Sequence, residues 1–173
     1  MRSVVSRIDR LLNGFYGLCG YLAAVCLVAL TLLILASIIS RLLGTFIGGL
    51  TEFSGYAMAA GSFLALAYTF REGGHIRVGV LLNAVSGKRR WLLEVWCLLV
   101  GSLFCGYLAF YLVKMTYVSW QLGDISEGAD AMELWIPQSA TAFGAVVLAI
   151  CVVHNCVRTI LRPSEPLAEV ETV

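Results

Sequence analysis

Four long stretches without a charged side chain constrain the fold of this chain more than any other feature of its sequence. They cover residues 11–40, 53–70, 95–113 and 134–157. Each comes close to or exceeds the roughly 18 to 20 apolar residues that cross the hydrocarbon core of a bilayer as a helix. A spanning β-strand would instead alternate in polarity over about ten residues. The sequence therefore predicts an all-α integral membrane protein with four transmembrane helices.

The overall composition agrees with this class. Hydrophobic residues make up 60% of the 173 positions, charged residues make up 13%, and the mean hydropathy is +0.87. These values lie far from those of soluble domains. The first apolar run is predicted to be an uncleaved anchor, because it is about twice as long as the apolar part of a signal peptide. All six cysteines lie inside apolar runs without CxxC spacing, which favours small buried side chains over disulfides or metal ligands.

The charged residues are distributed unevenly among the links between these runs. Basic residues cluster before the first run, between the second and third, and after the fourth: Arg2, Arg7, Arg10, Arg71, Arg77, Lys88, Arg89, Arg90, Arg158 and Arg162. The link before the fourth run is acidic and contains Asp124, Glu127, Asp130 and Glu133. By the positive-inside rule, both termini and the basic link are predicted to face the cytoplasm. The net charge of +1 gives no indication of a nucleic-acid partner.

The ends of the apolar runs predict one four-helix transmembrane domain over residues 1–162. Its helices are expected at about 13–41, 52–72, 88–121 and 134–161. Residues 75–86 are too short to span, and their small and polar positions share one narrow arc of a helical wheel. This pattern predicts a short interfacial amphipathic helix, with a plain loop as the alternative. Residues 163–173 are polar and contain prolines, so we expect a disordered cytoplasmic tail.

Side chains suited to catalysis or metal binding are sparse. His75 and His154 are the only histidines, and both are expected near the cytoplasmic side. We therefore predict no catalytic, cofactor-binding or metal site. The helix centres carry small hydroxyl residues such as Thr31, Ser62 and Ser102, whereas ion-coupled transporters usually bury ionisable groups there. The chain also has no P-loop pattern, which argues against direct ATP use.

Small residues in the second run point to close helix packing. Ala57, Gly61 and Ala65 follow one another at four-residue spacing, which places them on one face of a helix and favours contact with a neighbouring helix. The alternative is that these small residues face lipid. Together with the missing transport site, the pattern indicates a chain that works beside another membrane protein.

The segment "TFREGGHIRV", residues 69–78, combines charges, glycines and a histidine at the end of the second run. Arg71 and Glu72 are predicted to end the helix at the cytoplasmic boundary, followed by a hinge at Gly73 and Gly74. His75 and Arg77 are then expected to meet lipid headgroups or a partner's backbone. The alternative is a set of solvated charges at a helix end.

Several of these residues also carry a family resemblance. Glu52, Tyr56, the run "GSFLALAYTFREGGHIRVGVLL", the basic "GKRR" and an acidic outer loop ending in "LWIP" resemble the small membrane subunit of tripartite ATP-independent periplasmic (TRAP) transporters, the DctQ-like family. The resemblance covers about residues 10–162. One departure is Gly79, which stands where an acidic residue is common in the family.

The resemblance implies a bacterial inner-membrane subunit that is not an enzyme and carries no cofactor. Its implied partners are a large membrane subunit, in a heterodimer, and a periplasmic substrate-binding protein. In that family the large subunit holds the substrate and sodium sites and moves as an elevator, while the small subunit enlarges the scaffold. The implied substrates are small organic anions such as dicarboxylates or sugar acids, imported with an ion gradient. As a hypothesis, docking to the partner or to lipid headgroups involves Glu52, Tyr56, Arg71, Glu72, His75, Arg77, Trp120 and Trp135.

Two other classes of protein remain open from the sequence. A membrane anchor of a redox enzyme would need haem ligands on facing helices. A small homo-oligomeric exporter would need a buried carboxylate on an early helix. Glu94 is the nearest candidate for the second class, and it lies near the end of a run.

Overall fold

The computed structural model describes residues 2–45, 47–71, 88–129 and 131–161, with side chains from residue 14 onward except those of Arg71 and Lys88. These residues form four α-helices: α1 (Arg2–Leu42), α2 (Leu50–Arg71), α4 (Lys88–Leu122) and α5 (Trp135–Leu161). In this part of the chain the β-structure is limited to a single antiparallel bridge between Ile125 and Glu133. The predicted all-α fold is confirmed for the described residues.

Three of the four helices begin and end within a residue or two of the expected ranges. The exception is α1, which begins at Arg2 and not near residue 13. The expected start marked where the uncharged run begins, but arginine is a good helix former, so basic residues outside the hydrocarbon can continue the same helix. The predicted interfacial segment 75–86 and the predicted tail 163–173 lie outside the described residues.

Three helices are long and apolar enough to cross a membrane: Gly14–Leu42, Arg89–Leu122 and Trp135–Leu161. The helix α2 has 22 residues, about 33 Å at a rise of about 1.5 Å per residue, which matches the thickness of a hydrocarbon core. However, its sequence contains several glycine, serine, threonine and tyrosine residues, and α2 is not among the three helices that meet the hydropathy expected of a span. Length and composition therefore support three of the four expected membrane crossings.

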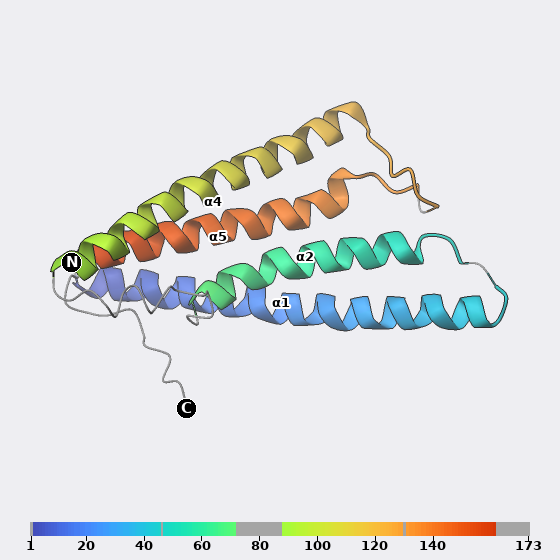
Figure 1. Ribbon diagram of the computed structural model, residues 1–173, viewed down its shortest axis with the longest axis horizontal. Helices are drawn as coiled ribbons and strands as arrows, with labels where there is room; N and C mark the ends of the chain where they lie inside the picture. The colour runs from blue at the N-terminus through green and yellow to red at the C-terminus, as the bar shows by residue number, and fades with distance from the viewer. Residues whose placement is uncertain (1, 46, 72–87, 130, 162–173) are drawn as a thin grey trace.

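The helices lie side by side in an open row. In Figure 1, α1 packs against α2, α2 against α5, and α5 against α4. Consecutive helices run in opposite directions. As a result, α1 and α4 start at the same side of the figure, and α2 and α5 end there. The loop between α1 and α2 and the loop between α4 and α5 lie at the other side of the figure. Since α1 and α4 form the two edges of the row, most of their surface faces away from the rest of the protein.

The core of the row lies where α1, α2 and α5 meet. It consists of Tyr16, Cys19 and Ala23 from α1, Leu64 and Ala67 from α2, and Val147 and Cys151 from α5. The contact between α2 and α5 is especially close, because a Cβ atom at Gly144 would lie 2.7 Å from the backbone carbon of Phe63. Glycine at this position therefore permits a helix approach that alanine would obstruct.

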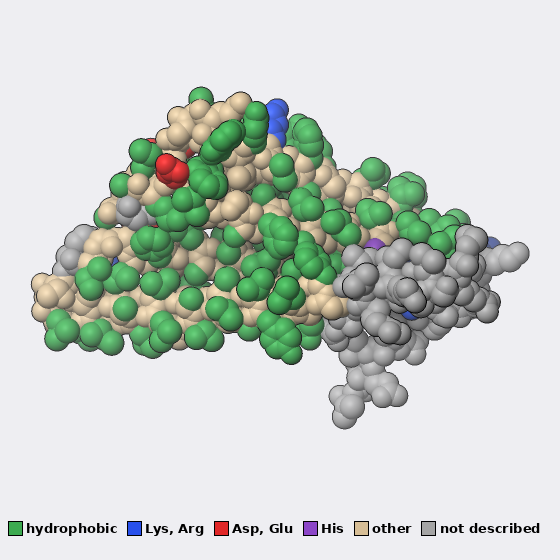
Figure 2. Space-filling model, turned by 180° about the vertical axis from the view of Figure 1, so that it is seen from behind, with side chains coloured by type: hydrophobic (Ala, Val, Ile, Leu, Met, Phe, Trp, Pro, Cys, Tyr) green, Lys and Arg blue, Asp and Glu red, His purple; other side chains and the backbone are tan. Residues whose placement is uncertain are grey.

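The outer faces of the edge helices are apolar and exposed. Leu32 of α1 and Leu103 and Phe104 of α4 have exposed fractions of 62%, 68% and 70%. Figure 2 shows hydrophobic side chains over the visible face of the molecule, outside the part that the grey atoms cover. In a soluble protein such a surface would drive aggregation. Here it is suited to contact with lipid tails and with other membrane proteins.

Candidate functional site

The loop between α4 and α5 is a structured element at the acidic end of the row. It begins at Gly123, whose positive φ of 64° is the usual end of a helix with a left-handed residue. The backbone N–H of Asp124 donates to the carbonyl of Ser119 at 3.1 Å, which completes this helix cap. Across the loop, the N–H of Ser126 donates to the carbonyl of Met132 at 2.8 Å. We call residues 123–134 the acidic loop.

The acidic loop presents three of the four predicted carboxylates in the described part of the chain, at Asp124, Glu127 and Glu133, whereas Asp130 lies outside it. The antiparallel bridge at Glu133 and the bond from the N–H of Leu134 to the carbonyl of Asp124, at 3.0 Å, hold the two sides of the loop together. The loop therefore offers a negatively charged surface with a defined backbone.

Tyr56 of α2 connects this loop to the middle of the row. Its hydroxyl donates to Ser126 Oγ at 3.0 Å, and the same oxygen accepts a hydrogen bond from the N–H of Gly128 at 3.2 Å. The ring of Tyr56 also packs edge-on against Phe53, with 6.1 Å between centroids. Of the predicted docking residues, Tyr56 thus has a direct role inside its own chain. Glu52 lies in the first turn of α2, where a negative charge is favoured by the helix dipole.

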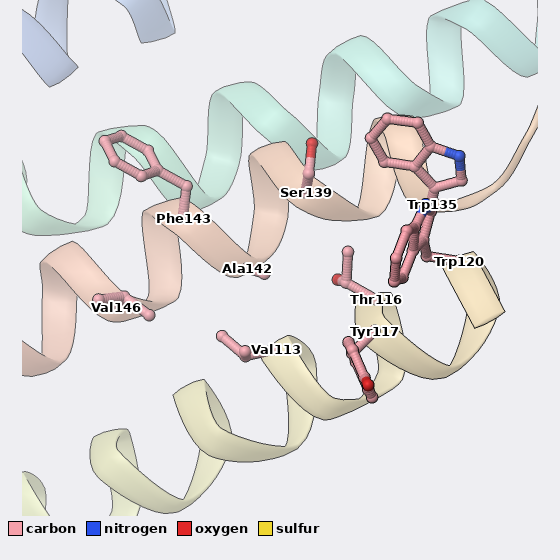
Figure 3. Close-up of a pocket in the computed structure, with 9 residues that line it drawn as sticks. All are labelled: Val113, Thr116, Tyr117, Trp120, Trp135, Ser139, Ala142, Phe143 and Val146. Carbon is pink, nitrogen blue, oxygen red and sulfur yellow. The ribbon is translucent and has the colours of Figure 1, made fainter.

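The structure brings Trp120 and Trp135 together at the acidic end of α4 and α5 (Figure 3). The Nε1–H of Trp135 donates to a carboxylate oxygen of Glu133 at 2.6 Å. Trp120 stacks at a tilt near Tyr117, with 6.0 Å between ring centroids. Indole and phenol rings are common at the level of lipid headgroups, and this cluster lies at the ends of two helices that are long and apolar enough to cross a membrane.

Below the two tryptophans, α4 and α5 leave a groove of about 530 Å³ between them (Figure 3). Its walls include Val113, Tyr117 and Trp120 of α4 and Trp135, Ala142, Phe143 and Val146 of α5. Two hydroxyl groups also reach the walls, and both donate to a carbonyl of their own helix. Thr116 donates to Leu112 at 2.9 Å, and Ser139 donates to Ile136 at 2.6 Å. We call this feature the α4–α5 groove.

The α4–α5 groove was not predicted from the sequence. The only available signal was the row of aromatic residues at the outer end of the third run, and such residues also occur along the rest of that run. A helix that is apolar on all sides does not reveal which face borders a groove.

The opposite end of the row carries the described basic residues of the links. The helix α2 ends at Arg71, α4 begins with Lys88, Arg89 and Arg90, and Arg158 lies in the last turn of α5. Near this end, the Nε1–H of Trp91 donates to the carbonyl of Thr159 at 3.1 Å and joins α4 to α5. The other predicted docking residues, Glu72, His75 and Arg77, and the predicted hinge at Gly73 and Gly74 lie outside the described residues.

The buried polar side chains in the described residues are small hydroxyls: Ser40, Ser54, Ser119 and Thr159. Ser40 donates to the carbonyl of Ser37 at 2.9 Å, and Ser54 donates to the carbonyl of Leu50 at 2.7 Å. Such bonds satisfy a hydroxyl within its own helix. In the portion of the chain that can be described, no three His, Cys, Asp or Glu side chains are grouped to hold a metal ion.

The described helices are long and apolar, with basic residues at one end of the row and acidic residues at the other. These features define a multi-pass membrane protein. The family model of the tripartite ATP-independent periplasmic transporters, DctQ component, matches residues 30–162. The match covers well over half of the chain, which therefore belongs to the DctQ family. A search of curated proteins found no match.

Family membership confirms the resemblance seen in the sequence. The chain is a component of a tripartite transporter and a multi-pass protein of the inner membrane. Tripartite transporters of this kind also contain a large membrane subunit and a periplasmic binding protein. These two proteins are the implied partners of this chain.

Proposed function

We propose that this chain is a non-catalytic scaffold subunit that braces the large membrane subunit of a secondary transporter. The observation that carries the proposal is the open row of helices. An open row leaves the broad apolar flanks of α1 and α4 free for other molecules, and its described buried polar groups include hydroxyls bonded within their own helices. This architecture is suited to extending a partner's surface in the membrane.

The transported solute would then pass through the large subunit. We propose that the complete transporter imports small organic anions, such as dicarboxylates or sugar acids, with an ion gradient such as that of sodium. The periplasmic binding protein would deliver the solute. These assignments rest on the family resemblance, and this subunit would not select the substrate.

The proposed topology has four crossings with both termini in the cytoplasm. The helices α1 and α4 start on the same side of the row, so the chain has to return between them, and α2 runs back beside α1. Arg71 and the basic start of α4 lie on the side that the positive-inside rule assigns to the cytoplasm. The acidic loop would then face the periplasm. Reporter fusions in this loop should be active only outside the cytoplasm, and cytoplasmic activity would contradict the topology.

We propose two docking regions, one at each membrane surface. On the periplasmic side they comprise Glu52, Tyr56, Trp120 and Trp135, and on the cytoplasmic side Arg71, Glu72, His75 and Arg77, with Gly73 and Gly74 as the hinge between helix and surface. The bond from Tyr56 to Ser126 supports an indirect role for this tyrosine, in which it fixes the shape of the acidic loop that a partner would meet.

Reconstitution into sealed vesicles tests the scaffold function. The chain alone, the large subunit alone and the two together are each supplied with the binding protein, an ion gradient and a labelled organic anion. We expect uptake with both membrane subunits and none with the chain alone. Uptake by this chain alone would contradict the proposal.

Affinity purification tests the cytoplasmic docking region. We expect Arg71→Gln or Arg77→Gln to reduce the amount of large subunit that is recovered with the chain, without changing which substrate the assembled complex prefers. Arg41→Gln is the matched control, because Arg41 lies in the last turn of α1 at the other end of the row. An intact complex with altered substrate preference would show that the docking assignment is wrong.

A further inference from the structure

The α4–α5 groove runs along the helices, in the direction in which a lipid chain lies in a bilayer. On α5 it extends from Trp135 to Val146, about 16 Å at a rise of about 1.5 Å per residue. This length is close to half of a hydrocarbon core of about 30 Å. The groove therefore starts at the tryptophan cluster, at the expected headgroup level, and reaches the middle of the membrane.

The size and lining of the groove select the kind of occupant. Its volume of about 530 Å³ lies within the range of about 300–1,000 Å³ typical of small-ligand sites. A partner helix is about 10–12 Å wide with its side chains and would need a broader surface. The hydroxyls of Thr116 and Ser139 already donate to their own helices, so the walls suit a hydrocarbon chain better than a polar ligand.

The charge at the open end selects the headgroup. Glu133 is hydrogen-bonded to Trp135 at the mouth of the groove, and Asp124 and Glu127 lie on the same acidic loop. These carboxylates disfavour a headgroup with net negative charge and favour one that carries an ammonium group. Lys114 of α4 is a cation that could attract a negatively charged headgroup. However, it lies over the ring of Tyr111, 5.9 Å from its centroid, and Tyr111 is not part of the groove wall.

We propose that the α4–α5 groove binds one acyl chain of an ammonium-bearing phospholipid of the outer leaflet. The chain fills the space between the two helices, the tryptophan rings lie at the level of the ester groups, and the ammonium lies beside the carboxylate of Glu133. The lipid thereby holds α4 and α5 at a fixed separation near the acidic loop. This role goes beyond the scaffold function and does not depend on transport.

The test uses the full chain in detergent, with phosphatidylethanolamine or phosphatidylglycerol of identical acyl chains added, and bound lipid is counted by native mass spectrometry. We expect one tightly held phosphatidylethanolamine and weaker retention of phosphatidylglycerol. Val113→Trp fills the groove and should reduce retention at least about tenfold. The matched control is Val118→Trp, which changes a valine of the same helix that is similarly exposed, 38% against 46%, and should have no effect.

A second variant addresses the headgroup. Glu133→Gln should reduce the preference for phosphatidylethanolamine by about two- to fivefold, the range of one exposed ion pair. The control Glu94→Gln, near the start of α4 and at the opposite end from the mouth of the groove, should leave the preference unchanged. The unmodified protein supplies a measurement that needs no variant. Phosphatidylethanolamine brominated near its headgroup should quench tryptophan fluorescence more than brominated phosphatidylglycerol does.

Equal retention and equal quenching by the two lipids would overturn the headgroup assignment. Unchanged retention in Val113→Trp would overturn the acyl-chain site. If Val113→Trp instead lost the large subunit while it kept its bound lipid, the groove would be a protein-binding site and the proposal would be wrong. Failure of the transport assay would leave these lipid measurements unaffected, so the two proposals can fail separately.

Discussion

Replacing Gly144 with alanine should separate the two halves of the helix row. A Cβ atom at this position would lie 2.7 Å from the backbone carbon and 2.8 Å from the Cβ of Phe63, and 2.9 Å from the backbone nitrogen of Leu64. Carbon atoms pack best at about 3.5–4.0 Å, so α2 and α5 would have to move apart by close to 1 Å. Backbone atoms cannot rotate away as a side chain can, and the contact would have to open as a whole.

The expected loss of stability follows from two opposing terms. Overpacking a well-packed contact costs about 1–3 kcal/mol, while alanine gains up to about 1 kcal/mol over glycine in helix propensity. We expect Gly144→Ala to lose about 1–2 kcal/mol. At about 2–4 °C per kcal/mol for a chain of this size, this corresponds to a decrease of about 2–8 °C in Tm.

Thermal unfolding in detergent, followed with a thiol-reactive fluorophore, measures this effect directly. The dye labels the exposed Cys97 before heating. Cys19 and Cys151 are buried in the core beside the α2–α5 contact, so the further increase in signal on heating reports the opening of that region. Gly106→Ala is the control, since a Cβ at Gly106 of α4 would meet nothing within 4 Å, and its Tm should stay the same or rise. If Gly144→Ala melts no lower than Gly106→Ala, close packing at this glycine does not hold the row together.

Two further substitutions test the connections at the ends of the row. Tyr56→Phe removes the hydroxyl that bonds to the acidic loop, a hydrogen bond worth about 1 kcal/mol. Backbone hydrogen exchange in the loop should then be faster than in the control Tyr21→Phe, and equal rates would show that this bond does not order the loop. Trp91→Phe removes the donor to the carbonyl of Thr159, so we expect faster hydrogen exchange near the end of α5. The control Trp96→Phe, at an exposed site, should change nothing, and an identical exchange pattern in both variants would argue against this link.

The positions of the helices could be predicted because charge and apolarity alternate along the chain. The uncharged runs 53–70 and 134–157 lie close to the bounds of α2 and α5, whereas α4 begins at Lys88 and ends at Leu122, beyond both ends of the uncharged run 95–113. The expected small-residue contact is also confirmed at Gly61, where a Cβ would lie 3.0 Å from the Cβ of Cys26 in α1. The sequence therefore located the elements and one of the faces through which they pack.

The order of the helices and the α4–α5 groove could not be predicted from the same pattern. In a membrane the faces that meet lipid and the faces that meet protein are both apolar, so hydrophobic periodicity does not distinguish them. Gly144 looked like any small residue in an apolar run, because the sequence does not show which helix lies against it. Tyr56 was singled out by resemblance, but its bond to Ser126 depends on a loop conformation that only the structure provides.

The position of α1 and α4 at the two edges of the row has a consequence for how cells keep this protein. A copy made without its companion would leave the flanks of α1 and α4 without protein contacts, and part of its folding free energy would be missing. By mass action, its half-life should then rise with the concentration of the companion subunit. Membrane proteases that remove loosely folded chains would clear the surplus, so the two subunits would reach matched amounts without any control of their synthesis.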